Sequence, residues 1–411
     1  MDDSEKKYIV KRKAKAAIQS IPFYLFRIFP IKRNKIVFTT IEGTTGFTCN
    51  PKYIAKELIR REQNGADYAL VWLVDDVTKK FPPGIKVVKN TLFNRAYQLT
   101  TAKIWIDNSR KQLEVRKRRG TTYIQTWHAN LGFKPTGFDR GKSFSEIARL
   151  VTQHDSDMID YVLSDSEWYE KQAPSGFLYH GPMVRFGSPR CDILVDKKSG
   201  SNGDYYVSVR RKYGLPADAK ILIYIPTFRG GSQGTERKID KEDHFPDFQR
   251  LRTALEKRFG GKWVIFLRLH PQLTARRIAS GIHEEGIYDV SLVDDLYEIL
   301  AGCDAAMSDY SSAAFDAAIG HMPVFLYADD LEEYQEERGK LLWDLRRLPF
   351  PLAINDAELE KNILGFNEQK YIREWNEFAD KIKLTEDGYA SSRTADLIDK
   401  LINSDRSSVR S

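Results

Sequence analysis

This 411-residue sequence has little cysteine, no long apolar run and none of the common nucleotide or metal signatures. Its three cysteines, Cys49, Cys191 and Cys303, lie far apart, which excludes a disulfide framework or a cysteine zinc site and indicates a reducing, cytosolic compartment. No segment has the length of apolar sequence that spans a bilayer. The motifs GxxxxGK[ST] and GxGxxG and an acidic metal triad are also missing, so we expect no bound metal or cofactor.

The formal charge of +7 is concentrated at the N-terminus. Residues 1–33 contain nine Lys or Arg against three Asp or Glu, a net of +6, interleaved with apolar and aromatic side chains. Pro22, Pro30 and the lack of a small-residue cleavage site argue against a signal peptide or a membrane-spanning helix. We predict that residues 1–34 form a basic amphipathic segment on an anionic membrane surface. The alternatives are a helix packed on the body with solvated lysines and, as a minor option, a nucleic-acid arm.

From Lys35 onward, short β-rich runs alternate with amphipathic stretches, which is typical of parallel βα units. In the first series the strand "KIVFTT" is followed by a glycine-bearing loop, and Asn50 and Pro51 are predicted as the N-cap and first position of the next helix. A Gly- and Ser-rich stretch at 195–204 reads as a linker before a second series of the same kind. We therefore predict an α/β protein with two doubly wound domains.

Four loops that directly follow predicted strands carry polar side chains. They contain His128; Thr227 and Arg229; Arg268 and His270; and the stretch "SDYSSAAFDAAIG" at 308–320, with Asp309, Ser311 and Ser312. Ligands of α/β sheets bind at the carboxyl ends of the strands. Each residue alone has a structural explanation, because serine and aspartate are ordinary helix caps and a lone histidine is often a bonded structural residue. Four such loops together favour a ligand site.

These residue types are suited to phosphate chemistry. Arg229 and Arg268 can present forked donors to phosphate oxygens, and a helix start beside Ser311 and Ser312 adds neutral donors and a positive dipole end. His270 can donate to the same anion. His128 can act as a general base, since an imidazole titrates close to operating pH. The pattern predicts a nucleotide diphosphate held by protein side chains.

The ordered motifs resemble those of one family, the CDP-glycerol glycerophosphotransferases, which include teichoic acid primases and polymerases and their capsule-forming relatives. The matching blocks, from about residue 35 to about 355, are "NKIVFTT", "NPKYIAKEL", "QTWHANLGFKPTGFD", "YVLSDSEW", "FGSPRCDIL", "KILIYIPTFR", "RLHP", "DDLYEILAGCDAAMSDYSSAAFD" and "PVFLYADDLEEYQEERG". The resemblance implies a GT-B-like fold with two Rossmann-like domains facing a cleft. It implies transfer of an alditol phosphate from a CDP-alditol to a hydroxyl of a lipid-linked saccharide or polyol-phosphate polymer, with release of CMP, at the cytoplasmic face of the membrane.

Carried over by position, the resemblance assigns residues to this reaction. His128 matches the proposed general base, and Arg268 and His270 match the block "RxHP". Ser311 and Ser312 match the donor-phosphate loop beside Asp309, while Asp330, Glu333 and Arg338 match the block that completes the donor side. The implied domains are residues 35–195 for the acceptor, residues 205–385 for the CDP donor, and a C-terminal helix and tail at 386–411.

The sequence departs from the family pattern in two loops. Ala129 follows His128 where the family more often has glycine, and "RRLPFPLA" lacks the usual glycine between its prolines. Both loops are expected near the acceptor or the alditol, so the choice between glycerol and ribitol stays open. A sugar-nucleotide glycosyltransferase on the same fold and a non-catalytic membrane adaptor are the alternative functions. A nucleic-acid binder ranks last, because the excess charge is terminal.

Overall fold

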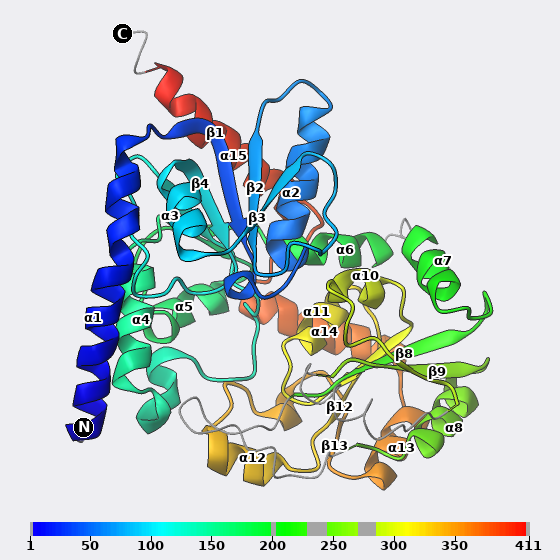
Figure 1. Cartoon of the computed structure of the whole chain (residues 1–411). Helices are drawn as coiled ribbons and strands as arrows, with labels where there is room; N and C mark the ends of the chain where they lie inside the picture. The colour runs from blue at the N-terminus through cyan, green and yellow to red at the C-terminus, as the bar shows by residue number, and fades with distance from the viewer. Residues whose placement is uncertain (1–2, 199–202, 228–244, 270–284, 408–411) are drawn as a thin grey trace. The chain divides into compact units, whose positions relative to one another are not determined.

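The computed structural model of the chain describes residues 3–198, 203–227, 245–269 and 285–407. By compactness it divides into two units (Figure 1). Unit 1 consists of Met1–Asn130, Thr136–Asp192 and Leu384–Ser411, and unit 2 of Leu131–Pro135 and Ile193–Lys383. The chain therefore enters unit 2 for five residues after Asn130, and its C-terminal helix returns to unit 1.

Unit 1 contains a seven-stranded parallel sheet in the order β3-β2-β1-β4-β5-β6-β7. Its strands are β1 (Lys32–Thr39), β2 (Ala69–Val74), β3 (Ile85–Lys89), β4 (Ala102–Asp107), β5 (Thr122–Gln125), β6 (Tyr161–Ser164) and β7 (Met183–Arg185). Its helices are α1 (Asp3–Leu25), α2 (Cys49–Glu62), α3 (Leu92–Thr100), α4 (Glu146–Ser156), α5 (Glu167–Gly176) and α15 (Ala390–Ser407), with short 3₁₀ turns η1 (Phe26–Ile28), η2 (Ile41–Gly43), η3 (Gly137–Ser143) and η4 (Pro189–Cys191).

Both faces of this sheet are buried, which explains why its strands read as continuous apolar runs. Ile36 and Trp72 belong to the core cluster that includes residues of α2 and α15. Val37 and Trp105 belong to a second cluster with residues of α1 and α3. Alternate side chains of one strand thus fill two layers, and Figure 1 shows helices on both faces.

Unit 2 contains a six-stranded parallel sheet in the order β10-β9-β8-β11-β12-β13. Its strands are β8 (Lys220–Ile225), β9 (Trp263–Leu267), β10 (Ile287–Asp289), β11 (Ala305–Ser308), β12 (Val324–Tyr327) and β13 (Leu352–Ala353). Its helices are α7 (Gly203–Lys212), α8 (Phe248–Phe259), α10 (Leu296–Ala301), α11 (Ala313–Ile319), α12 (Leu331–Arg338), α13 (Asp356–Leu364) and α14 (Glu368–Ile382), and η5 (Leu345–Arg347) is a 3₁₀ turn. Helix α6 (Asp192–Lys198) begins at the boundary between the units.

The predicted fold class, α/β with two doubly wound parallel sheets, is confirmed. Each sheet has a switch point, where the order of the strands along the chain reverses: β1 beside β4 in unit 1, and β8 beside β11 in unit 2. Ligands of open α/β sheets bind outside the carboxyl ends of the strands at this point. Two local predictions differ from the structure, since α6 and α7 extend into the predicted linker, and α2 begins at Cys49 after Thr48, which makes the prediction of Asn50 as N-cap wrong.

The N-terminal helix α1 has two apolar stripes. Ile9, Ala16 and Phe23, spaced seven residues apart, are buried on the side of the helix that contacts the body, where α1 meets α3. Ile18 and Leu25, on another side, are 68% and 60% exposed. Within the described ranges, no helix combines the length and apolar character needed to cross a bilayer.

Candidate active site

In unit 2 the loops after β8 and β11 are joined at the switch point by Asp309. The backbone N–H of Thr227 donates to both carboxylate oxygens of Asp309, at 2.9 Å each, and the N–H of Tyr310 donates to Oδ1. Asp309 is fully buried. Its negative charge is therefore directed at backbone donors, and the side chain fixes the shape of the loop in which Ser311 and Ser312 stand.

Ser311 and Ser312 lie at the start of α11. Ser312 occupies the N-cap position with helical backbone angles, and its hydroxyl makes no capping hydrogen bond. The N–H of Ala313 donates to Ser311 Oγ at 3.4 Å, a weak contact. Capping of α11 therefore does not account for the Ser312 hydroxyl, which agrees with a role toward a ligand.

Tyr310 connects this loop to the start of α12. Its hydroxyl donates to Asp330 Oδ1 at 2.8 Å, and its ring stacks on that of Tyr334, with centroids 3.9 Å apart. Asp330 stands at the N-cap of α12 but does not cap it with its side chain. Sequence reasoning assigned a role to neither tyrosine, because their contacts join residues that are twenty or more positions apart.

The remaining predicted donor-side residues are placed as follows. Arg268 follows β9, and its Nη1 donates to the backbone oxygens of Val290 (3.0 Å) and Val293 (2.5 Å), so part of the guanidinium ties β9 to the loop after β10. Burial lowers the pKa of Arg268. Glu333 is exposed on α12. Arg229 and His270, and the side chain of Arg338, lie outside the described residues.

In unit 1, His128 follows β5 and is held by the loop after β4. Its Nδ1 lies 2.6 Å from the backbone oxygen of Asn108. A carbonyl oxygen can only accept, so Nδ1 carries the proton and the lone pair of the neutral ring is on Nε2. This tautomer is the one that a general base needs when the second nitrogen faces the substrate.

The surroundings of His128 keep the ring neutral. Burial, followed by the nearby cations Arg190 and Arg110, lowers the pKa of His128 from 6.5 to about 4, against the opposing effect of its bond to Asn108. Asn108 also joins the loops after β4 and β1 at the switch point, since its Oδ1 accepts the N–H of Ile41 at 2.8 Å. His128 is therefore unprotonated at neutral pH and able to accept a proton.

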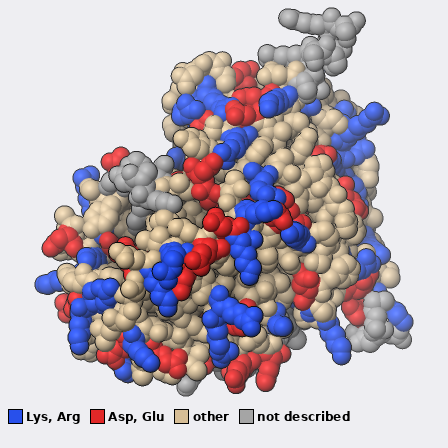
Figure 2. Space-filling model, turned by 180° about the vertical axis from the view of Figure 1, so that it is seen from behind, with Lys and Arg blue, Asp and Glu red and all other residues tan. Residues whose placement is uncertain are grey.

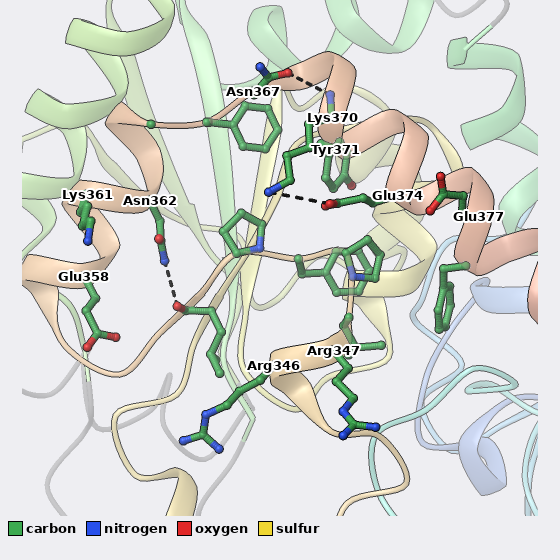
Figure 3. Close-up of a pocket in the computed structure, with 18 of the residues that line it drawn as sticks. Arg346, Arg347, Glu358, Lys361, Asn362, Asn367, Lys370, Tyr371, Glu374 and Glu377 are labelled. Carbon is green, nitrogen blue, oxygen red and sulfur yellow. Dashed lines mark hydrogen bonds and ion pairs between the residues drawn. The ribbon is translucent and has the colours of Figure 1, made fainter.

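Unit 2 also has a groove of about 1160 Å³ along α13, α14 and the segment 346–351 (Figure 3). This segment contains most of the loop "RRLPFPLA", and none of the predicted site residues lines the groove. Phe350 and Phe378 form part of its wall, and both rings contact Phe315 of α11, with centroids 5.5 and 5.8 Å apart. The wall of the groove thus packs against α11, the helix that Ser312 precedes.

Positive charge in the groove exceeds negative charge. Its acidic residues all have partners: Glu374 pairs with Lys370 (3.7 Å), Glu377 pairs with Arg373 (3.9 Å), and Glu358 accepts the N–H of Ile354 (3.1 Å). The exposed cations Arg346, Lys361 and Lys381 have no ion-pair partner in the part of the chain that the structure describes. Three cations are therefore available to an anionic ligand.

The chain matches one protein family over most of its length. A sequence profile of the family described as CDP-Glycerol:Poly(glycerophosphate) glycerophosphotransferase matches residues 21–400. A teichoic acid poly(glycerol phosphate) polymerase of Bacillus spizizenii is 26% identical over 387 residues, which are 92% of this chain and 95% of that protein. A teichoic acid glycerol-phosphate transferase of Staphylococcus aureus is 28% identical over 409 residues, 95% of this chain and all of that protein.

Solved structures and other relatives extend these matches. A variant of the wall teichoic acid polymerase TagF superposes with a TM-score of 0.79 and 25% identity, covering 99% of this chain and 100% of that chain. The chain spans about half the length of two further poly(glycerol phosphate) polymerases, from Staphylococcus epidermidis and Bacillus subtilis. Ribitol-phosphate polymerases match at 26–28% identity, so identity alone does not separate the two alditols.

Proposed function

Because the chain belongs to the CDP-glycerol:poly(glycerophosphate) glycerophosphotransferase family, we propose that it transfers glycerol phosphate from CDP-glycerol to an acceptor hydroxyl in teichoic acid synthesis and releases CMP. The observation that carries this proposal on the structural side is the state of His128. A half-buried, neutral imidazole with its proton held by Asn108 is arranged to accept a proton through Nε2. In this proposal unit 1 supplies the general base that acts on the acceptor hydroxyl, and unit 2 binds the CDP donor.

The reaction is a displacement at phosphorus. The acceptor oxygen attacks the β-phosphorus of CDP-glycerol, the new O–P bond forms, and the bond from this phosphorus to the bridging oxygen breaks. The acceptor proton passes to His128 Nε2, and the electron pair of the broken bond leaves with CMP. The residues of unit 2 stabilise the negative charge that develops on CMP and on the transferred phosphate.

We assign the donor-side residues as follows. Ser311, Ser312 and the amides of their loop contact the pyrophosphate, with His270, Arg229 and the free part of Arg268 adding donors. Asp309 and Thr227 hold this loop in shape through the bonds described above. Asp330, Glu333 and Arg338 complete the donor side, and the bond from Tyr310 to Asp330 supports the first of these assignments.

The groove of unit 2 is the place we propose for the phosphates of a polyol-phosphate acceptor. Such a chain carries one negative charge per unit, which complements Arg346, Lys361 and Lys381, and its polyol carbons can lie on the aromatic wall that includes Phe350. Phe315 connects this wall to α11 and so to the donor loop.

Helix α1 is proposed to bind the membrane surface. Ile18, Ile21, Leu25 and Ile28 follow a helical spacing of three, four and three residues, and all are more than half exposed. Basic residues flank this stripe, and together they match an anionic leaflet. On the face of the molecule shown in Figure 2, basic and acidic side chains are interspersed, which offers no broad single-sign surface for nucleic acid.

The donor is tested by thermal stabilisation of the purified protein with CDP-glycerol, CDP-ribitol, CMP and UDP-sugars, because a ligand that binds the native state raises the melting temperature. Stabilisation by CDP-glycerol and CMP, but by no UDP-sugar, is the expected result. The reverse order would support the sugar-nucleotide glycosyltransferase alternative.

A further inference from the structure

The turn that leads into His128 has an unfavourable backbone. Trp127, which precedes His128, has a φ of 49°, in the left-handed region that a bulky residue rarely adopts. Such a conformation persists only where the surrounding structure holds it. The ring of Trp127 lies between neighbours, with Arg110 over it at 4.8 Å and Phe177 edge-on at 4.8 Å. The contacts that hold its backbone therefore decide where His128 stands.

Asn50 provides two of these contacts. Its Nδ2 donates to the backbone oxygens of Thr126 and Trp127, at 3.0 Å each, and its Oδ1 accepts the N–H of Arg190 at 3.0 Å. Asn50 is fully buried in the first turn of α2. Each polar atom of the side chain is thus used on backbone, and the two carbonyls require an N–H₂ group, which neither alanine nor aspartate has.

Gln125 holds the same turn from the strand side. Its Oε1 accepts the N–H of Trp127 at 2.9 Å, and its Nε2 donates to Tyr123 Oη (2.8 Å) and to the backbone oxygen of Ser109 (3.0 Å). Tyr123 in turn donates to Asp155 Oδ1 at 3.1 Å. The N–H and the carbonyl oxygen of Trp127 are therefore both bonded by buried side-chain amides, the N–H by Gln125 of β5 and the oxygen by Asn50 of α2.

We propose that Asn50 is a positioning residue for phosphoglycerol transfer, whose amide fixes the strained Trp127 turn so that His128 keeps Nδ1 on Asn108 and Nε2 available for the acceptor proton. The proposal rests on the proposed role of His128 as the base. It explains why the helix after the first strand carries a buried asparagine as its second residue, where the residue does not cap the helix.

The test compares kcat, KM and the pH dependence of kcat/KM in Asn50→Ala, Asn50→Asp and the matched control Thr121→Val. Thr121 is also buried in unit 1 and donates to a backbone oxygen, that of Ala102 (2.8 Å), at the opposite end of β5. The variants are full-length, and their folding is checked by thermal denaturation and CDP-glycerol binding. His128→Ala is measured beside them.

We expect Asn50→Ala to lower kcat about tenfold or more with the KM for CDP-glycerol within about twofold. The acid limb of kcat/KM should move from near 4 toward 6.5, because a loosened turn exposes His128 to water and so weakens the burial that lowers its pKa. Asn50→Asp should lose more, since its carboxylate would oppose two carbonyls. Thr121→Val should lower the melting temperature without moving kcat or the acid limb.

A kcat and an acid limb in Asn50→Ala that match those of Thr121→Val would overturn the proposal. If Asn50→Ala does not fold, Gln125→Met, which releases the Trp127 N–H together with the Ser109 oxygen and the Tyr123 hydroxyl, is expected to shift kcat and the acid limb in the same direction, and unchanged values would again overturn it. Full activity in His128→Ala would instead refute the proposed function, so the two failures are distinguishable.

Discussion

At the switch point of unit 1 a neutral amide joins the loops after β1 and β4, whereas at that of unit 2 a carboxylate joins the loops after β8 and β11. Asn108 accepts the N–H of Ile41 and offers its backbone oxygen to His128, while Asp309 accepts the N–H of Thr227. The amide adds no charge beside a histidine that must stay neutral. The carboxylate tightens a serine loop. The same position of the fold thus occurs twice, and we propose that the bridging side chain suits it to proton transfer in unit 1 and to phosphate binding in unit 2.

The largest effect on stability is expected from removing the bridge of unit 2. Asp309→Ala leaves the buried N–H groups of Thr227 and Tyr310 without their acceptor, so the free energy of unfolding should fall by about 2–5 kcal/mol and CDP-glycerol binding should be lost. Chemical denaturation and thermal stabilisation by the donor measure the two effects. Asp309→Asn keeps one acceptor oxygen and should lose less. Equal stability of wild type and Asp309→Ala would contradict the role of this bridge.

The environment of His128 in unit 1 predicts that the stability of the protein depends on pH. The unfolded chain protonates His128 near 6.5, but the native chain does so only near 4, so the unfolded state binds more protons between these values. His128 therefore does not lower the free energy of unfolding above about pH 6.5. Below that pH the free energy of unfolding falls as the pH decreases toward 4. Denaturation of wild type and His128→Gln across this range measures it, and an unchanged pH slope in the variant would contradict the burial of a neutral ring.

In unit 2, acceptor binding in the groove and donor binding at the serine loop should respond differently to loss of positive charge from the groove. Neutralising Arg346, Lys361 and Lys381 together should raise the KM for a polyol-phosphate acceptor about three- to tenfold, and the effect should shrink at high salt. The KM for CDP-glycerol should stay constant. Neutralising Arg211, Lys257 and Lys262, exposed cations of unit 2 that do not line the groove, is the matched control. An equal change in the KM for CDP-glycerol would contradict the proposal that the groove binds the acceptor.

Changes to the exposed stripe of α1 are expected to have the smallest effect on the reaction. Ile18→Asn combined with Leu25→Asn should weaken binding to anionic vesicles several-fold and leave CMP release from a water-soluble acceptor unchanged. Phe93→Asn, at another exposed apolar position of unit 1, is the control. These variants spare Phe23, which is buried in the core and would be lost in a deletion of residues 1–33. Unaltered vesicle binding would leave α1 as a packed helix.

Much of this arrangement could be predicted from the sequence, because periodicity is a local property. The alternating runs predict both parallel sheets, and the sequence also places His128, Thr227 and the loop of Ser311 directly after strands, where the structure has them. Asn50 was misassigned, since Asn-Pro before an apolar run is a good capping signal and the sequence does not show that Thr126 and Trp127 lie beside it. Tyr310 was missed for the same reason, as its partner Asp330 is twenty residues away.

The measurement that tests the central claim most directly is acceptor-dependent CMP release from CDP-glycerol and CDP-ribitol by the wild type and by His128→Ala. We predict release from CDP-glycerol that requires the acceptor, and a loss of kcat in the variant of about 10²–10⁴-fold with the donor KM retained. A folded His128→Ala protein that releases CMP at the wild-type rate, or a wild type that releases none from either donor, would contradict it.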